Sequence, residues 1–152
     1  MRPRREPFRQ AEQTHFVTFA TADRRPFFRQ EPWAQVLLNI LARYQESYDL
    51  HDFVLMPDHV HLLLSPHVPL ERAVQLIKGG FSFQAKRAFD WKLDIWQAGF
   101  ADHCIRDHHD FATHIAYIRK NSASLREGSR IFDGEHCSLP LAPEPPRLKP
   151  PA

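Results

Sequence analysis

Two histidines, His59 and His61, stand two positions apart in the apolar run HVHLLLS. If this run is a β-strand, both imidazoles point to the same face, with about 6.6 Å between their Cα atoms. Two imidazoles that project in parallel can bind one metal ion. Two polar residues on an exposed sheet face would give the same pattern. The pair therefore indicates a metal site without defining a reaction.

A second pattern lies in the segment that follows Asp107 and Asp110, where Tyr117 and Asn121 are four residues apart. At helical spacing these two residues share one stripe, and His114 and Asp110 lie close to it. The apolar residues of this segment occupy a different stripe, turned away by roughly 100° or more: Phe111, Ile115 and Ile118. Tyr117 is therefore expected outside the core, either as a boundary tyrosine or as a reactive group. His114, one turn earlier, is either a general base or a surface histidine.

Several unrelated classes of protein contain a His-x-His pair, among them cupins, carbonic anhydrases and many hydrolases. Histidine-triad nucleotide hydrolases need a third alternating histidine, but Leu63 occupies that position. Amidohydrolases need a barrel of about 250 residues, which exceeds the 152 residues of this chain. These two classes are excluded.

The elements that must position these residues follow from periodicity and breakers. Alternating apolar runs predict strands over 14–21, 51–56 and 59–65, with a fourth over 100–106. Helical spacing predicts helices that begin near Pro32, after Pro69 and at a cap formed by Asp107 or Asp110. The order β-α-β-β-α-β-α predicts an α+β fold: a ferredoxin-like (RRM-like) sandwich with helices on one face of an antiparallel sheet, plus a C-terminal tyrosine-bearing helix. Both histidines are expected on the open face.

Composition predicts one globular domain, since 43% of the residues are hydrophobic and 25% are charged. Residues 1–12 form a basic N-terminal arm, residues 13–135 the domain, and residues 136–152 a proline-rich, extended tail with little to bury. Cys104 and Cys137 suggest neither a zinc site nor a redox motif, which favours a reducing compartment. No apolar run is long enough to span a membrane, and no secretory signal is recognisable.

Three stretches of the sequence carry a family resemblance. The first, FVLMPDHVHLLL from Phe53 to Leu64, resembles the strand–turn–strand of the histidine–hydrophobic–histidine (HUH) motif in single-tyrosine transposases. The second, WQAGFADHCIRDHHDFATHIAYIRKNSASL from Trp96 to Leu125, is similar to the tyrosine helix and the segment that leads into it in REP-associated tyrosine transposases. The block LIKGGFSFQAKR between them is also similar, so the resemblance covers about residues 14–126.

This resemblance implies roles for particular residues. His59 and His61 match two metal ligands, Tyr117 matches the nucleophile, and Asn121 matches the third ligand. Two positions depart from the family: Asp58 stands where asparagine is common, and Ser122 stands where proline is common. Neither departure removes a catalytic atom.

The implied activity is that of a metal-dependent single-stranded DNA endonuclease and strand transferase, which acts on hairpin (REP-like) DNA through a 5′-phosphotyrosine intermediate. The expected cofactor is Mg²⁺ or Mn²⁺; manganese accepts imidazole more readily. The expected partner is single-stranded or hairpin DNA, handled by a monomer or homodimer at the nucleoid of a bacterial cytoplasm. A catalytically inactive nucleic-acid-binding protein of the same fold and an unrelated metal-dependent phosphoesterase are alternatives.

DNA contacts must come from local basic groups, because the formal net charge is only +2. The candidates lie on the second predicted helix, beside the tyrosine and in the N-terminal arm: Lys78, Lys86, Arg87, Arg119, Lys120, Arg2, Arg4 and Arg5.

Overall fold

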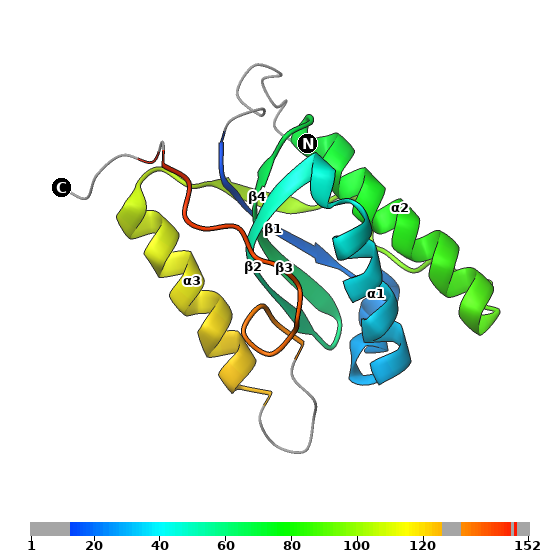
Figure 1. Cartoon of the computed structure of the whole chain (residues 1–152). Coiled ribbons are helices and arrows are strands. Elements are labelled where there is room, and N and C mark those ends of the chain that lie inside the picture. Colours follow the sequence, from blue (N-terminus) through cyan, green and yellow to red (C-terminus); the bar gives the residue numbers. More distant parts are fainter. Residues whose placement is uncertain (1–12, 126–131, 147, 149–152) are drawn as a thin grey trace.

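The computed structural model describes residues 13–125, 132–146 and 148. Its four strands are β1 (His15–Ala20), β2 (Tyr48–Met56), β3 (His59–Pro66) and β4 (Ala101–Cys104), and its three α-helices are α1 (Glu31–Arg43), α2 (Leu70–Phe89) and α3 (His108–Ala123) (Figure 1). The predicted order of elements is confirmed. β2 begins three residues before its predicted start, and β4 is shorter than predicted. The predicted N-terminal arm lies outside the described residues.

The strands form one antiparallel sheet in the order β2-β3-β1-β4. β1 is the first strand in the sequence but an inner strand of the sheet, because it pairs with β3 on one side and β4 on the other. His61 pairs with Thr18, and His59 pairs with Ala20. This register places both histidines at the end of the sheet where the Pro57–Asp58 turn joins β2 to β3.

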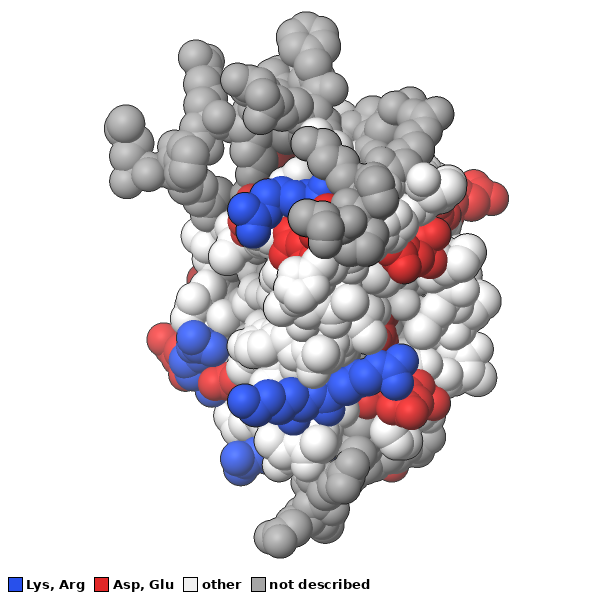
Figure 2. Space-filling model, turned by 90° about the vertical axis from the view of Figure 1, so that its left-hand side faces the viewer, with Lys and Arg blue, Asp and Glu red and all other residues white. Residues whose placement is uncertain are grey.

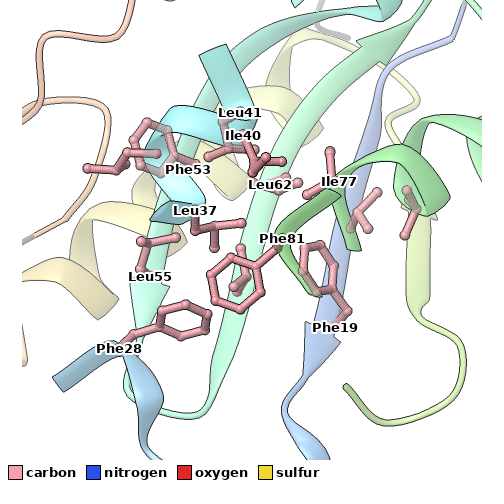
Figure 3. Close-up of a cluster of buried hydrophobic side chains, with 14 of the residues drawn as sticks. Phe19, Phe28, Leu37, Ile40, Leu41, Phe53, Leu55, Leu62, Ile77 and Phe81 are labelled. Atoms are coloured by element: carbon pink, nitrogen blue, oxygen red, sulfur yellow. The ribbon is translucent and has the colours of Figure 1, made fainter. Parts of the chain in front are cut away.

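Helices α1 and α2 pack side by side on one face of the sheet and enclose the main core (Figure 1). The strand side chains on this face follow the predicted alternation, with Val60, Leu62 and Leu64 of β3 fully buried. Phe81 of α2 lies over the sheet near Phe19 (Figure 3). Each buried aliphatic or aromatic side chain contributes about 1.5–3 kcal/mol relative to exposure, so this layer stabilises the sheet.

The opposite face is not open as predicted, because α3 packs across it (Figure 1). A second apolar cluster joins the helix to the sheet and consists of Val54, Leu63, Ile105, Phe111 and Ile118. Leu63 points to the face of the sheet opposite Leu62 and Leu64, and its apolar side chain is buried there only because another apolar surface covers it. The predicted apolar stripe of the last helix provides that surface, which brings the tyrosine helix over the histidine face.

Helix α3 begins at a capped end. Asp107 has extended backbone angles, and its carboxylate accepts a hydrogen bond of 2.8 Å from the Asp110 N–H. Such caps stabilise a helix by about 1 kcal/mol. Asp107 is therefore the cap, and Asp110 is left for other contacts.

The described part of the proline-rich tail packs on the domain, which corrects the prediction that it has little to bury. The Ala142 N–H donates to the Leu50 carbonyl of β2 at 2.7 Å, and the Ala142 carbonyl oxygen lies 3.2 Å from Nδ1 of His51. Cys137 and Leu139 pack against the main core. The segment is extended, as predicted, but it covers the β2 edge of the sheet.

We therefore expect removal of residues 138–152 to lower the free energy of unfolding by about 1–3 kcal/mol, from the lost burial of Leu139 and the lost edge hydrogen bonds. Urea unfolding of the full and shortened chains measures the difference. Leu139→Ser in the full chain should reproduce part of the loss. Leu93→Ser, at a side chain 53% exposed, should not. An unchanged midpoint after truncation would show that the segment adds no stability.

Candidate active site

The strand register brings His59 and His61 together on the face beneath α3. Their ring centroids are 4.8 Å apart, with the ring planes nearly perpendicular at 83°. His61 is only 5% exposed. The two imidazoles therefore converge as the alternation of a strand predicts.

Each imidazole is held by a hydrogen bond at Nδ1. The Thr18 hydroxyl lies 2.8 Å from His61 Nδ1, and an Asp58 carboxylate oxygen lies 2.7 Å from His59 Nδ1. In both rings Nε2 is then the nitrogen left for a metal. Among the described residues, the buried His61 Nε2 has no hydrogen-bond partner. Metal-binding histidines typically have one nitrogen fixed by an outer partner, and this pair fits that arrangement.

Burial, and to a smaller extent the neighbouring His59, lowers the pKa of His61 to about 4. The ring is therefore neutral at pH 7, and its Nε2 lone pair is free. A neutral imidazole is the form that binds a metal.

Tyr117 lies against the histidine pair. Its ring meets the His61 ring edge to face, with centroids 5.4 Å apart, and it also contacts Phe16 at 5.8 Å. The side chain is 46% exposed although its ring touches the buried site. The tyrosine is thus outside the core, as predicted, and a substrate can approach it.

Asn121 follows Tyr117 by one helical turn on α3. Its Nδ2 atom is buried and, within the described part of the chain, has no hydrogen-bond partner. A buried amide group without a partner is costly, and a half-turn of the amide exchanges its nitrogen for the acceptor oxygen. The Asn121 amide is therefore available to bind a further group one turn after Tyr117.

The two departures from the family pattern have structural consequences. Asp58 accepts the hydrogen bond from His59, where an amide oxygen would be a weaker acceptor. Ser122 donates its hydroxyl hydrogen to the buried carboxylate of Asp133. The serine therefore ties the end of α3 to the C-terminal segment.

The described basic residues that were predicted to contact DNA do not all lie on one side of the molecule. Lys86 and Arg87 lie on α2, which is on the other side of the sheet from Tyr117 (Figure 1). Lys78 Nζ donates to the carbonyls of Gln97 and Gly99, so this side chain fixes the chain before β4. Arg2, Arg4 and Arg5 lie outside the described residues.

Arg119 and Lys120 lie near the tyrosine, and both are exposed. Arg119 Nη1 is 3.7 Å from a carboxylate oxygen of Glu135. On the face that carries α3, basic side chains alternate with acidic ones and surround an uncharged area (Figure 2). One band of basic side chains crosses the lower middle of this view, with acidic side chains beside its right end (Figure 2).

One cluster was not predicted from the sequence as a unit. Ligand atoms of His103, Asp110 and His114 lie within 4.8 Å of one another. The sequence signal was the spacing of Asp110 and His114, four apart on one helix, but His103 comes from β4 and no local pattern links it to them. His114 was considered only as a general base or a surface residue.

The fold and this site define a class of protein: an α+β domain whose tyrosine helix lies over a His-x-His pair on the sheet. The model of the family described as "Transposase IS200 like" matches residues 10–121. The chain belongs to this family of transposases.

Solved structures share the fold. A REP-associated tyrosine transposase bound to a REP hairpin is 24% identical, with a TM-score of 0.65, over 82% of this chain and 74% of that one. A proposed transposase of Deinococcus radiodurans R1 is 23% identical, with a TM-score of 0.52, over 80% of this chain and 98% of that one. A search of curated proteins finds no match. No helix in the described ranges is long and apolar enough to cross a membrane.

Proposed function

We propose that this chain is a metal-dependent endonuclease and strand transferase for single-stranded DNA, with Tyr117 as the nucleophile. The observation that carries the proposal is the contact between the half-exposed Tyr117 ring and the buried, neutral His61. Tyr117 thus lies against an imidazole whose buried Nε2 has no hydrogen-bond partner among the described residues.

In the proposed reaction the Tyr117 oxygen attacks the scissile phosphorus and forms a phosphotyrosine ester with the 5′ side of the strand. The bond from phosphorus to the 3′ oxygen breaks, the phenol loses its proton, and the 3′ oxygen gains one. The energy of the broken phosphodiester is kept in the new ester. Attack by another 3′-hydroxyl on that ester reverses the step and joins a new strand.

A free tyrosine has a pKa near 10 and is a poor nucleophile at pH 7. Three residues fit a divalent ion: His59 and His61 through Nε2, and Asn121 through its amide oxygen. When bound, such an ion polarises the phosphate and stabilises its developing charge. Two imidazoles suit Mn²⁺ better than Mg²⁺. Thr18 and Asp58 hold the two rings in the binding orientation.

All of these groups come from one chain, since Tyr117 lies against His61 of its own sheet. The Ser122–Asp133 hydrogen bond and the second apolar cluster keep α3 in this place. We therefore propose that a monomer contains a complete site.

The proposed substrate is a hairpin with a single-stranded flank. A REP-associated transposase with the same fold binds a REP hairpin. An in-line attack by a tyrosine is easiest on a flexible single strand, while a folded stem offers shape for recognition. The net charge of +2 gives little unspecific attraction to a duplex.

We expect the chain to bind a hairpin with a single-stranded flank at least tenfold more tightly than a fully paired duplex of the same sequence, or about 1.4 kcal/mol. Gel-shift titrations at one salt concentration measure both affinities. Equal affinity for the plain duplex would argue for an ordinary duplex-binding protein instead.

A further inference from the structure

Three side chains with metal-ligand atoms meet where β4 leads into α3. His103 Nε2 lies 2.8 Å from one carboxylate oxygen of Asp110, and His114 Nδ1 lies 3.2 Å from the other. His114 Nδ1 also lies 2.8 Å from the backbone carbonyl oxygen of Asp110. The two imidazole rings are stacked, with centroids 4.8 Å apart and an angle of 17° between them. Two imidazoles and one carboxylate thus surround a common point.

The backbone positions these residues, with His103 on β4 and the other two on α3. Asp110 and His114 are separated by one turn of α3, a spacing that places two ligands on one helix face. The Arg106 N–H donates to the Asp110 carboxylate at 3.0 Å and orients it. Partial desolvation raises the pKa of Asp110, but the hydrogen bonds from Arg106 and His103 outweigh it, so the pKa lies below its usual value. The carboxylate is therefore ionised at neutral pH.

The cluster is separate from the His59–His61 pair. His103 is paired with Phe16 across β1 and β4, whereas His61 is paired with Thr18 across β1 and β3. Two strand spacings of about 4.8 Å and an offset of two residues put the Cα atoms of His61 and His103 roughly 12 Å apart. The Phe16 ring fills the gap and contacts both His61 and His114.

We propose that His103, Asp110 and His114 form a second divalent metal site, of the two-histidine, one-carboxylate type, for a transition ion such as Zn²⁺. Imidazole donors favour such ions over Mg²⁺ and Ca²⁺. The His103 side chain is 42% exposed, so an ion can enter and water can complete the coordination. Arg106 Nε lies 3.6 Å from Asp110, and its side chain is 79% exposed, so it can move aside as the ion binds.

The bound ion would join the end of β4 to the first two turns of α3. It would replace the hydrogen bond between His103 and the Asp110 carboxylate. If Nδ1 of His114 is the ligand, its hydrogen bond to the Asp110 backbone carbonyl is lost as well, and any protons on the ligating nitrogens would be released. Tyr117 lies one turn after His114 on the same helix. The site therefore fixes the part of the helix from which the tyrosine projects, and its role is to position Tyr117 rather than to contact the substrate.

The test uses the full chain, stripped of metal by a chelator and titrated with Zn²⁺ by calorimetry. The double variant His59→Gln/His61→Gln removes the other pair, so the result does not depend on the proposed function. In this background we expect one equivalent of Zn²⁺ to bind and the Tm to rise by several degrees. Adding His103→Gln should abolish both effects. His103 is partly exposed, and circular dichroism of this variant checks that it is folded.

His109→Gln is the matched control, because His109 is an exposed histidine in the first turn of the same helix and lies outside the cluster. Adding it to the double variant should leave the binding of Zn²⁺ unchanged. The inference is overturned if the double variant binds no Zn²⁺, or if it binds the ion equally well with and without His103.

Discussion

Tyr117→Phe abolishes the covalent adduct with DNA while hairpin binding stays within about twofold of the wild type, a difference of less than 0.5 kcal/mol. The substitution removes only the attacking oxygen. The ring keeps its edge-to-face contact with His61 and its contact with Phe16. Incubation of the protein with labelled hairpin DNA, followed by a denaturing gel, shows the adduct as a band that survives denaturation.

Tyr44→Phe is the control for this experiment. Tyr44 directly follows α1, on the other side of the sheet from α3, and lies beside Gly80 of α2 in the main-core layer. This variant should form the adduct at the wild-type rate. A phenylalanine variant at position 117 that still forms the adduct would exclude Tyr117 as the nucleophile. Loss of both the adduct and hairpin binding would mean that the tyrosine acts in recognition.

The parts of this site that could be predicted from the sequence depend on local periodicity. The alternation of a strand is enough to place His59 and His61 on one face, opposite Val60 and Leu62. The stripe that separates Tyr117 from Phe111 and Ile118 follows likewise from helical spacing. Both predictions are confirmed, because a side chain's direction within one element is fixed by the backbone of that element.

Contacts between elements were harder to predict. The histidine face was expected to be open, yet Leu63 on that face and the apolar stripe of α3 each needed an apolar partner. Taken together, those two patterns would have predicted that α3 covers the sheet. The partnership of His103 with Asp110 and His114 depends on the turn between β4 and α3, for which the sequence has no periodic signal.

The C-terminal segment shows a different limit. Its prolines cannot donate to a β-ladder, so the sequence suggested a solvated tail. The Ala142 N–H is nevertheless sufficient for one hydrogen bond to β2, and Leu139 supplies apolar contact with the core. Proline density excludes a central strand but does not exclude an extended segment that covers an edge.

His59→Ala and His61→Ala should each reduce metal-dependent cleavage by more than about 100-fold. Substitution of a residue that hydrogen-bonds a metal ligand commonly lowers metal affinity or activity by 10–100-fold. Each of these substitutions removes a ligand itself, so the loss should be larger. Asn121→Ala should cost less, roughly tenfold, because water can replace an amide oxygen. Cleavage of labelled hairpin DNA is measured over a series of Mn²⁺ and Mg²⁺ concentrations.

The residues that hold the Nδ1 atoms of the two histidines provide a milder test of the same mechanism. Thr18→Val removes the hydroxyl that holds His61 Nδ1 and leaves a side chain of similar shape. We expect it to raise the metal concentration needed for half-maximal cleavage by about tenfold and to leave the maximal rate nearly unchanged.

His67→Ala, at an exposed histidine just after β3, is the control and should behave as the wild type. If a chelator leaves the wild-type rate unchanged, the histidine pair does not act through a metal. A loss of cleavage in His61→Ala without any change in metal dependence would mean that the His61 ring orients Tyr117 through their contact alone.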